Sequence, residues 1–276
     1  MPELPEVETI RKTLENFVIG KTIEEVQVFW PKIIKHPDDI NHFKQILIGQ
    51  TIQKMGRRGK FLLFYLNDYV LISHLRMEGK YRVVHQDDPI NKHTHVIFRF
   101  NNGEELRYND VRKFGTMHVY PRGEELNHPP LDKLGPEPFD DAFTFDYFYS
   151  KLKRTERSIK AVLLDQTVVT GLGNIYVDET LFRAGVYPTK IANKLTKQEI
   201  ERIRMEAIET LKEAVLQGGT TIRSYVNGQG EMGMFQQDLF VYGQENKACR
   251  NCGQPIVKIR VAGRGTHVCN QCQREG

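Results

Sequence analysis

Four cysteines near the C-terminus carry the clearest chemical signal in this chain of 276 residues. They form two pairs, Cys249-x2-Cys252 and Cys269-x2-Cys272, with sixteen residues between the pairs. Each tight turn can direct two thiolates at one tetrahedral ion, so this spacing is typical of a structural zinc site. Two disulfides are the alternative, which a cytoplasmic chain disfavours. Four sulfur ligands leave no coordination position open for catalysis, and they remove every cysteine from the candidate nucleophiles.

The residues between the two cysteine pairs predict a β-hairpin that the zinc ion would hold together. Residues 255–261 alternate with β-type side chains, 262–265 form a turn, and 266–268 return. This pattern places Arg264 between two glycines at the tip of the hairpin, as an exposed side chain.

The N-terminus is a second candidate for chemistry. Met1 precedes the small residue Pro2 and is expected to be removed, which would leave a secondary amine with a pKa near ~8. Such an amine can attack a carbonyl-like carbon and form an iminium. The carboxylates of Glu3 and Glu6 could then serve acid and base steps. Proline and glutamate are also favoured at helix starts, and the spacing alone favours that purely structural interpretation.

A helix and a series of strands are expected to position the N-terminal residues. Val7, Ile10, Leu14 and Phe17 follow helical spacing. The strands that come next are short and closely spaced, which predicts an antiparallel sandwich or barrel. The expected strands are residues 22–29, 51–57, 60–66, 69–75, 80–84, 94–100, 104–108 and 116–120.

The pattern becomes helical in the second half of the chain. Five of the twelve prolines fall within 121–138, which indicates a linker. One helix is expected to begin near Asn174 and to end at Gly185. Residues 196–199 form a capping box that opens another helix, which runs to the glycines at 218–219.

These elements predict an α+β protein with three domains. We expect an N-terminal helix with an antiparallel β-sandwich at 1–133, a helical domain at 134–245 and a zinc-bound β-hairpin at 246–276. No apolar run approaches the ~18 residues of a membrane span, and the acidic N-terminus is unlike a signal peptide. A cytoplasmic protein without a membrane partner is therefore expected.

Basic residues are unevenly distributed along the chain, although its net charge is only +4. Lysine and arginine are in excess within 54–82, 151–160 and 246–276. Clusters of this kind, gathered on one face, indicate binding to a polyanion. Each cluster taken singly is equally well explained as solvated surface charge.

Other motifs for cofactor chemistry are weak. Residues 228–233 match G-x-G-x-x-G, but no strand precedes them and no βαβ unit surrounds them, so a mobile loop is the better interpretation. His93 and His95 face the same side of a strand and lack a third ligand, so a surface or core role is expected from the residues alone. No redox or nucleotide cofactor is predicted.

The chain resembles the bacterial formamidopyrimidine-DNA glycosylases over essentially all of its 276 residues. The motifs that carry the resemblance are PELPEVET at 2–9, GRRGKFLL around Lys60, HLRMEGK around Met77, NDVRKFG around Arg112 and Phe114, and GLGNIYVDE around Asn174, followed by the zinc hairpin with Arg264. The resemblance implies a helix–two-turns–helix element around Asn174 and a zinc finger at the four cysteines.

The resemblance also implies a catalytic set of four residues, Pro2, Glu3, Lys60 and Arg264, and places Asn174 among the DNA contacts. Pro2 would be the nucleophile, and Glu3 the acid that assists base loss and opening of the sugar. Lys60 would contact phosphate near the lesion. Asn174 and Arg264 would grip the DNA backbone around it, and a helix N-terminus at Asn174 suits a phosphate.

A further set of residues is implied to act when a nucleotide leaves the stack, which costs a few kcal/mol. Phe114 would wedge the stack, Arg112 would hydrogen-bond the orphaned base, and Met77 would help to fill the void. Without the resemblance, core packing would be expected for Met77 and Phe114. Lys160 and His93 are further expected DNA contacts. The residues expected to recognise the lesion are Glu6, Glu78, Thr220, Thr221, Ile222, Arg223, Ser224 and Tyr225, beside a closing loop at 227–238.

The implied function is removal of oxidised purines, namely 8-oxoguanine and formamidopyrimidines, from duplex DNA. The Pro2 iminium would acidify C2′, and β- and δ-elimination would then cut the strand at the abasic site. The expected partner is double-stranded DNA with an oxidised purine or an abasic site, and the expected cofactor is one structural zinc ion. A monomer that associates with the bacterial nucleoid is expected.

Two alternatives remain open at this point. An endonuclease VIII-like glycosylase would prefer oxidised pyrimidines, but Leu4 and the run Arg112-Lys113-Phe114 favour the purine branch. A non-catalytic zinc protein that only binds DNA would need the basic clusters and the hairpin, but not a free Pro2. Substitution of Pro2, with DNA binding measured in parallel, distinguishes an enzyme from a protein that only binds DNA, because the latter would lose nothing.

Overall fold

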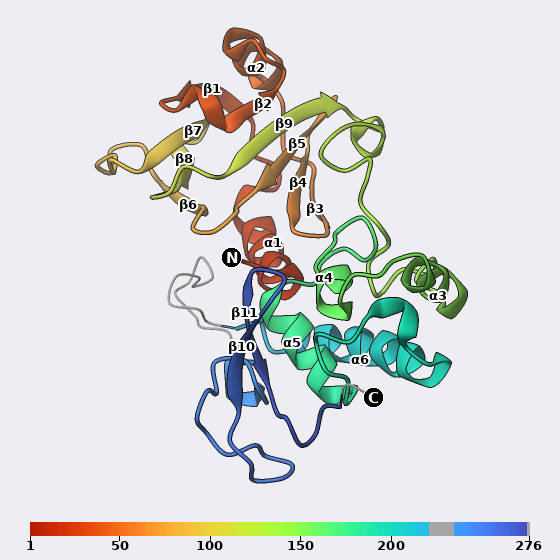
Figure 1. Cartoon of the computed structure of the whole chain (residues 1–276). Coiled ribbons are helices and arrows are strands. Elements are labelled where there is room, and N and C mark those ends of the chain that lie inside the picture. Colours follow the sequence, from red (N-terminus) through yellow and green to blue (C-terminus); the bar gives the residue numbers. More distant parts are fainter. Residues whose placement is uncertain (221–234, 275–276) are drawn as a thin grey trace. The chain divides into compact units, whose positions relative to one another are not determined.

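Two β-sheets dominate the N-terminal part of the chain, in a computed structural model that describes residues 1–220 and 235–274. Their strand orders are β1-β7-β8-β6 and β2-β9-β5-β4-β3 (Figure 1). The strands are β1 (Ile23–Val28), β2 (Ile34–His36), β3 (Lys54–Arg58), β4 (Phe61–Tyr65), β5 (Tyr69–His74), β6 (Lys80–His85), β7 (Thr94–Phe100), β8 (Glu104–Asn109) and β9 (Thr116–Pro121). Every predicted strand is present. Strand β2 is an addition, and it pairs with β9 in parallel, whereas the other strand pairs of the two sheets are antiparallel.

The core of this part lies between the two sheets. Val96 and Phe98 of the four-stranded sheet belong to the same buried cluster as Leu62, Leu71 and Met117 of the five-stranded sheet. Side chains of a strand point alternately to its two faces, so each sheet can bury one face in such a sandwich. The predicted β-sandwich is confirmed.

Helix α1 (Leu4–Val18) precedes the sheets and buries Val7, Leu14 and Val18 in the same core. Pro5 lies in its first turn, where a missing backbone N–H leaves no hydrogen bond unmade. The helix packs against β3 and β4 (Figure 1). The predicted N-terminal helix is therefore confirmed, and it holds the chain terminus beside the five-stranded sheet.

A shorter helix, α2 (Ile40–Leu47), was not predicted from the sequence. Asp39 caps it, since its Oδ1 accepts hydrogen bonds from the backbone N–H groups of Asn41 and His42 at 2.7 and 3.2 Å. Phe43 and Leu47, four residues apart, supply its buried side.

The second half of the chain is mainly helical. Its helices are α3 (Phe145–Lys153), α4 (Ile159–Leu163), α5 (Asn174–Arg183) and α6 (Lys197–Leu216), with the 3-10 turns Ala192–Lys194 and Phe235–Asp238. Two further 3-10 turns, Pro31–Ile33 and Glu125–Asn127, lie in the N-terminal part. Thr196 and Glu199 form the predicted capping box at the start of α6, with Glu199 N to Thr196 Oγ1 at 3.2 Å. The helices expected near Asn174 and after Thr196 are both confirmed.

Strands β10 (Val257–Val261) and β11 (Arg264–Val268) form the predicted C-terminal hairpin. The turn is tighter than predicted, because Val261 pairs directly with Arg264 and only Ala262 and Gly263 lie between them. Both of these residues have positive φ, at 50° and 74°. Positive φ at both central positions is typical of a type I′ turn, whose twist matches that of the strands. Arg264 is therefore the first residue of β11.

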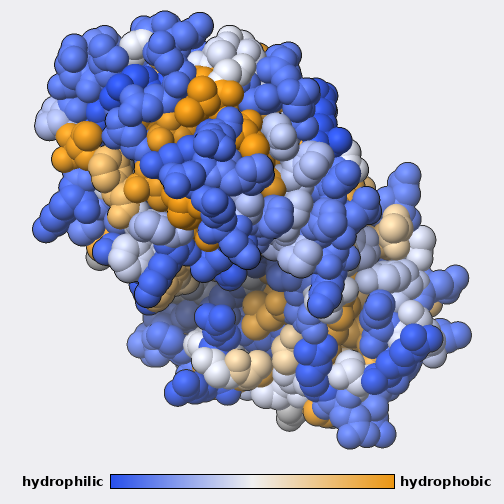
Figure 2. Space-filling view, turned by 90° about the horizontal axis from the view of Figure 1, so that it is seen from above, coloured by the Kyte–Doolittle hydropathy of each residue, from blue (hydrophilic) through white to orange (hydrophobic). Residues whose placement is uncertain are grey.

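The chain divides into two compact units. Among the described residues, unit 1 holds 1–132, and unit 2 holds 133–220 and 235–274. The division into three domains at 133 and 245 stays a prediction. In the part of the chain that the structure describes, no helix is long and apolar enough to cross a membrane. Hydrophilic residues cover most of the face drawn in Figure 2, and hydrophobic residues appear in limited patches between them.

Candidate functional site

The N-terminus of unit 1 is enclosed by acidic side chains. Pro2 is buried, and Glu3 and Glu6 are only 3% and 5% exposed. The backbone N–H of Glu3 donates to Oε2 of Glu6 at 2.8 Å, and a capping box returns a bond from the Glu6 backbone to the Glu3 side chain. The start of the helix thus fixes both carboxylates beside Pro2. The structural and the chemical interpretations of these residues are compatible, because one geometry serves both.

Burial and nearby charges act in opposite directions on the pKa of the terminal amine. Burial lowers the pKa of the Met1 α-amine below its usual value. The carboxylates of Glu3, Glu6 and Glu78 act in the opposite direction, while the Lys60 ammonium lowers the pKa further. Unit 1 therefore brings together the terminal amine, the three carboxylates and Lys60, for which the family resemblance implies roles in catalysis and lesion recognition.

Lys60 lies in the turn between β3 and β4 and is 6% exposed. The preceding residue, Gly59, has φ of +55°, a left-handed conformation that glycine adopts without steric cost. Arg57 holds this turn, with Nη1 donating to the Gly59 carbonyl at 2.9 Å and Nε donating to Glu8 Oε2 at 3.1 Å. Burial alone would raise the pKa of Glu8, but hydrogen bonds and charge from Arg11 and Arg57 outweigh it and lower that pKa. The ionised Glu8 thus fastens the Lys60 turn to α1.

His74 at the end of β5 belongs to the same neighbourhood, and sequence reasoning missed it. Burial lowers the pKa of His74 to about 3, and the charges of Arg76 and Lys60 act in the same direction. The imidazole is therefore neutral, and its Nδ1 accepts the backbone N–H of Arg76 at 2.9 Å. Its place in HLRMEGK, three residues before Met77, was the signal that could have identified it. His74 supports the loop that carries Met77.

Three side chains predicted to fill a DNA void are exposed in unit 1. Met77 and Phe114 are 37% and 50% exposed, and Arg112 is exposed as well. The Arg112 guanidinium lies 4.7 Å from the centre of the Phe114 ring. Met77 and Phe114 are therefore not core residues, which was the alternative expectation for them. All three side chains therefore lie at the surface of unit 1.

Glu78 and His93 line one cavity of about 380 Å³ in unit 1. His93 is half-buried, and its backbone N–H donates to Asn91 Oδ1 at 2.8 Å. Its neighbour His95 is buried and uses Nε2 to bond the Asp110 carbonyl at 2.7 Å. His95 therefore has the core role that the residues alone suggested, and His93 faces a cavity.

In unit 2, Asn174 is the first residue of α5 and contacts the zinc hairpin. Its Nδ2 donates to the Gly265 carbonyl at 2.9 Å, next to the exposed Arg264. The start of α5 and the start of β11 thus lie side by side. Unit 2 brings together two of the residues that were predicted to grip DNA.

Lys160 was predicted to contact DNA, but the structure buries it inside unit 2. Its side chain is wholly buried, and its Nζ bonds Asp178 Oδ1 at 2.6 Å and Thr266 Oγ1 at 2.7 Å. An ammonium enclosed by protein cannot contact a phosphate from this position. The reason is Asp178, a buried acid on α5 whose other oxygen accepts the His267 backbone N–H at 2.9 Å. Asp178 was not predicted from the sequence, although an acidic residue inside the GLGNIYVDE motif could have pointed to it.

Most of the predicted lesion-recognition segment lies outside the described residues. Thr220 is described, and it is 3% exposed. Thr221, Ile222, Arg223, Ser224 and Tyr225 fall in the segment that the structure does not describe, as does most of the glycine-rich loop expected at 227–238.

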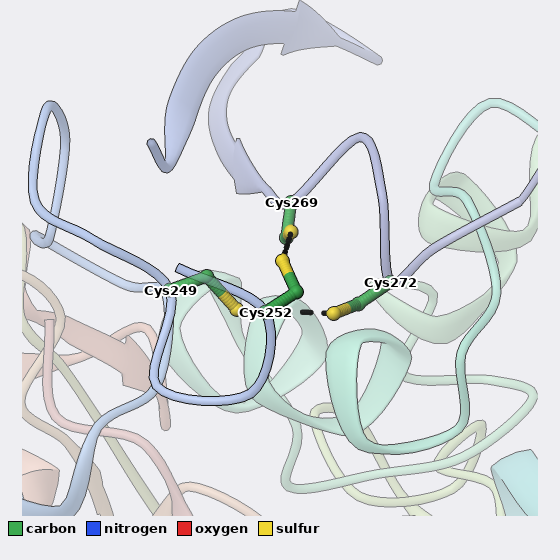
Figure 3. Close-up of side chains that lie close together, drawn as sticks. All are labelled: Cys249, Cys252, Cys269 and Cys272. Carbon is green, nitrogen blue, oxygen red and sulfur yellow. Dashed lines mark hydrogen bonds between the residues drawn. The ribbon is translucent and has the colours of Figure 1, made fainter. Parts of the chain in front are cut away.

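The four cysteines of unit 2 converge as a zinc site requires. Their Sγ atoms all lie within 4.8 Å of one another and point toward a common centre (Figure 3). The Sγ atoms of Cys249 and Cys272 are 3.8 Å apart, and those of Cys252 and Cys269 are 3.4 Å apart. Neither pair is therefore a disulfide. Thiolates about 2.3 Å from a tetrahedral zinc ion would be about 3.8 Å from one another. The donor set and the spacing fit one structural Zn²⁺, as predicted.

Three family models match the chain in succession. They are "Formamidopyrimidine-DNA glycosylase N-terminal domain" over residues 1–117, "Formamidopyrimidine-DNA glycosylase H2TH domain" over 134–226, and "Zinc finger found in FPG and IleRS" over 246–274. Among curated proteins, the formamidopyrimidine-DNA glycosylase of Oceanobacillus iheyensis is 67% identical over 99% of this chain and 98% of its own length. The Bacillus licheniformis protein of the same name is 61% identical over 100% of both chains.

Solved structures give the same match. The Lactococcus lactis Fpg in complex with DNA that contains an abasic site superposes with a TM-score of 0.92 and 43% identity, over 99% of this chain and 100% of that chain. A mutant of the same protein bound to DNA that contains Fapy-dG superposes with a TM-score of 0.93, at the same identity and coverage.

Proposed function

We infer that this chain, which belongs to the formamidopyrimidine-DNA glycosylase family, is a base-excision DNA glycosylase for oxidised purines. The observation that carries the inference is the buried N-terminus of unit 1, where Pro2 is enclosed with two carboxylates and Lys60. The related Lactococcus lactis structures, bound to abasic-site and Fapy-dG DNA, support DNA with these lesions as the partner.

Removal of Met1 would move the terminal amine one residue inward, to the buried nitrogen of Pro2. Burial disfavours the ammonium form, so the free amine is available as a nucleophile. The Pro2 nitrogen attacks C1′ of the damaged nucleotide as the bond from C1′ to the base breaks, and the proton lost by the amine passes to the departing base. Glu3 then protonates O4′ as the C1′–O4′ bond breaks and the sugar ring opens. The product is an iminium between Pro2 and C1′.

The iminium then leads to strand cleavage. It withdraws electrons from C1′ and so acidifies the C2′ proton, whose removal expels the 3′ phosphate by β-elimination. A second elimination expels the 5′ phosphate, and hydrolysis of the iminium releases Pro2. We propose that these lyase steps follow base removal in this chain.

Lys60, Asn174 and Arg264 would bind the phosphates around the lesion. Lys60 contributes a cation from a turn that Arg57 and Gly59 hold in place. Asn174 lies at a helix N-terminus, where N–H groups and the helix dipole favour an anion. The zinc ion, when bound by the four cysteines, is structural and holds the hairpin that presents Arg264. Lys160 fixes this hairpin from within unit 2.

Met77, Arg112 and Phe114 would replace the nucleotide that leaves the stack. An exposed aromatic side chain can insert between bases, and a guanidinium can hydrogen-bond the base left without a partner. We propose His93 as a further DNA contact. The lesion itself would be recognised by Glu6, Glu78, Thr220, Thr221, Ile222, Arg223, Ser224 and Tyr225.

The three expected segments would divide this work, with the chemistry in 1–133 and DNA binding in 134–245 and 246–276. We propose that the enzyme acts in the cytoplasm, associated with the nucleoid through its DNA substrate.

A substitution at the terminus tests the proposed chemistry. Pro2→Gly retains a terminal amine but exchanges the secondary amine for a primary one, whereas Glu3→Gln retains the shape of the acid without its proton transfer. Both variants should bind an 8-oxoguanine duplex within about threefold of the unmodified protein, while excision falls at least tenfold. A protein that only binds DNA would show no excision to lose, and that result would overturn the proposal.

A further inference from the structure

We propose that Asp110 is the positioning residue for the exposed loop that carries Arg112 and Phe114, a role that rests on the void-filling function proposed above. Asp110 directly follows β8 and is 1% exposed, although it precedes four exposed residues, 111–114. A buried carboxylate at the base of an exposed loop requires partners, because an unpaired buried charge is strongly destabilising.

The partners of Asp110 are the backbone N–H groups of that loop. Oδ1 accepts from Arg112 N at 2.9 Å, and Oδ2 accepts from Phe114 N and Gly115 N at 2.8 and 2.9 Å. Hydrogen bonds from N–H groups to a carboxylate are stronger than neutral ones. One side chain therefore fixes the backbone of both residues that are proposed to enter the DNA stack.

The backbone of Asp110 is fixed in turn by the sheet below it. Its N–H donates to the His93 carbonyl at 3.0 Å, and its carbonyl accepts from His95 Nε2 at 2.7 Å. His93 directly precedes β7 and His95 is its second residue, and β7 is an inner strand of the four-stranded sheet. The carboxylate thus connects the exposed loop to the rigid core of unit 1.

Tyr108 joins the second exposed loop to the same point. Its hydroxyl donates to Asp110 Oδ2 at 3.4 Å, and it lies against two glycines. A Cβ at Gly115 would lie 1.7 Å from this hydroxyl, and a Cβ at Gly79 would lie 2.2 Å from it. Gly79 follows Met77 by two residues, so both loops approach one hydroxyl as closely as only glycine allows.

The experiment compares Asp110→Asn and Asp110→Glu with the unmodified protein. Asparagine has the shape of aspartate, but its NH₂ group cannot accept a backbone N–H, so bonds at one of the two oxygens are lost. Glutamate keeps both acceptors and displaces them by one methylene group. The matched control is Asp68→Asn, because Asp68 is exposed and accepts from the Gln50 side chain in another turn. If Asp110→Asn fails to fold by circular dichroism, Asp110→Glu takes its place.

The single tryptophan of the chain reports the position of the loop without DNA. The Lys113 ammonium lies 4.2 Å from the centre of the Trp30 ring. In Asp110→Asn, release of the loop should raise acrylamide quenching of Trp30 fluorescence by at least 1.5-fold, and Asp68→Asn should not change it. Equal quenching in Asp110→Asn and the unmodified protein would overturn the anchoring role, whatever the enzyme does.

The second readout is the ratio of two rates. Excision of 8-oxoguanine from a duplex needs the void-filling residues, whereas cleavage of an abasic site in single-stranded DNA has no stack to fill. Asp110→Asn should lower the ratio of the first rate to the second at least tenfold, as should Phe114→Ala. Raised quenching with an unchanged ratio would overturn the positioning role. If the unmodified protein excises nothing, the proposed function fails, and the quenching result alone then decides whether Asp110 anchors the loop.

Discussion

Lys160 and Asp178 form an ion pair in unit 2 in which both side chains are wholly enclosed, with Nζ and Oδ1 2.6 Å apart. Lys160 also contacts Thr266, and Asp178 also accepts from the His267 backbone, so the pair connects α4, α5 and β11. Two charges lose much hydration on burial, and this loss is offset only when every bond is made. The pair therefore specifies where the zinc hairpin lies in unit 2.

Lys160→Met should strongly destabilise the protein. It leaves Asp178 as a buried charge without its counter-ion, which costs about 3–5 kcal/mol of unfolding free energy. Urea denaturation measures this loss. The control is Lys212→Met, since Lys212 and Glu209 form an exposed pair whose loss should cost below about 1 kcal/mol. If the two variants lose equal stability, the buried pair is not what holds the hairpin.

Removal of zinc should release the hairpin. The small core around it contains Cys249 and Cys269 themselves, with Ile256, Val241 and Phe182, and offers little stability without the metal. We expect one zinc ion per chain by atomic absorption. Chelation should weaken binding to an abasic-site duplex at least tenfold while the β-sheet signal in circular dichroism persists, and added zinc should restore binding. Full affinity in metal-free protein would contradict this account.

Acid should destabilise unit 1 through His74. Its pKa is about 3 in the folded protein, below the ordinary value of 6.5, so the unfolded chain binds the proton first as the pH falls. The stabilisation is complete above pH 6.5 and is lost between pH 6.5 and about 3, by up to about 1.4 kcal/mol for each pH unit.

His74→Asn tests this dependence, because asparagine can accept the Arg76 N–H and does not titrate. Urea denaturation at pH 7 and pH 4.5 should show a smaller loss of stability in this variant than in the unmodified protein. The exposed His42 provides the control, since His42→Asn should leave the pH dependence unchanged. An unchanged dependence in His74→Asn would refute the assignment.

Phe114→Ala should separate function from stability. Phe114 is 50% exposed, so its loss should change the unfolding free energy by less than about 0.5 kcal/mol. Excision of 8-oxoguanine should fall at least tenfold, because the wedge is removed. By contrast, Phe64→Ala on β4 removes a side chain that is 1% exposed and should cost about 3–5 kcal/mol. Unimpaired excision by Phe114→Ala would exclude the wedge role.

Periodic patterns and local motifs predicted most of the fold. The spacing of Val7 and Leu14 predicted α1, the Thr196 capping box predicted the start of α6, and the cysteine spacing predicted the convergence of four thiols. Each of these signals lies within a few residues of the element that it forms. Helix α2 carried the same kind of signal in Asp39, with Phe43 and Leu47 four residues apart, and was overlooked.

Contacts between residues that are far apart in the sequence could not be predicted from it. Lys160 was interpreted as a surface cation because its partners Asp178 and Thr266 lie 18 and 106 residues away. The bonds of Asp110 depend on the conformation of the loop after β8, and the neutral state of His74 depends on burial. Residue types indicated where chemistry could occur, but burial and long-range pairing decide which charges are available to a partner.

The central claim is that Pro2 forms a covalent bond with the damaged nucleotide. Borohydride reduction should trap the iminium on a duplex with one 8-oxoguanine opposite cytosine, with a dihydrouracil duplex as the comparison substrate. The account predicts an adduct that peptide mapping places on Pro2, with strand cleavage strongest on 8-oxoguanine. If protein with a verified N-terminal Pro2 gives no adduct on either duplex, or an adduct on another residue, the proposed mechanism is wrong.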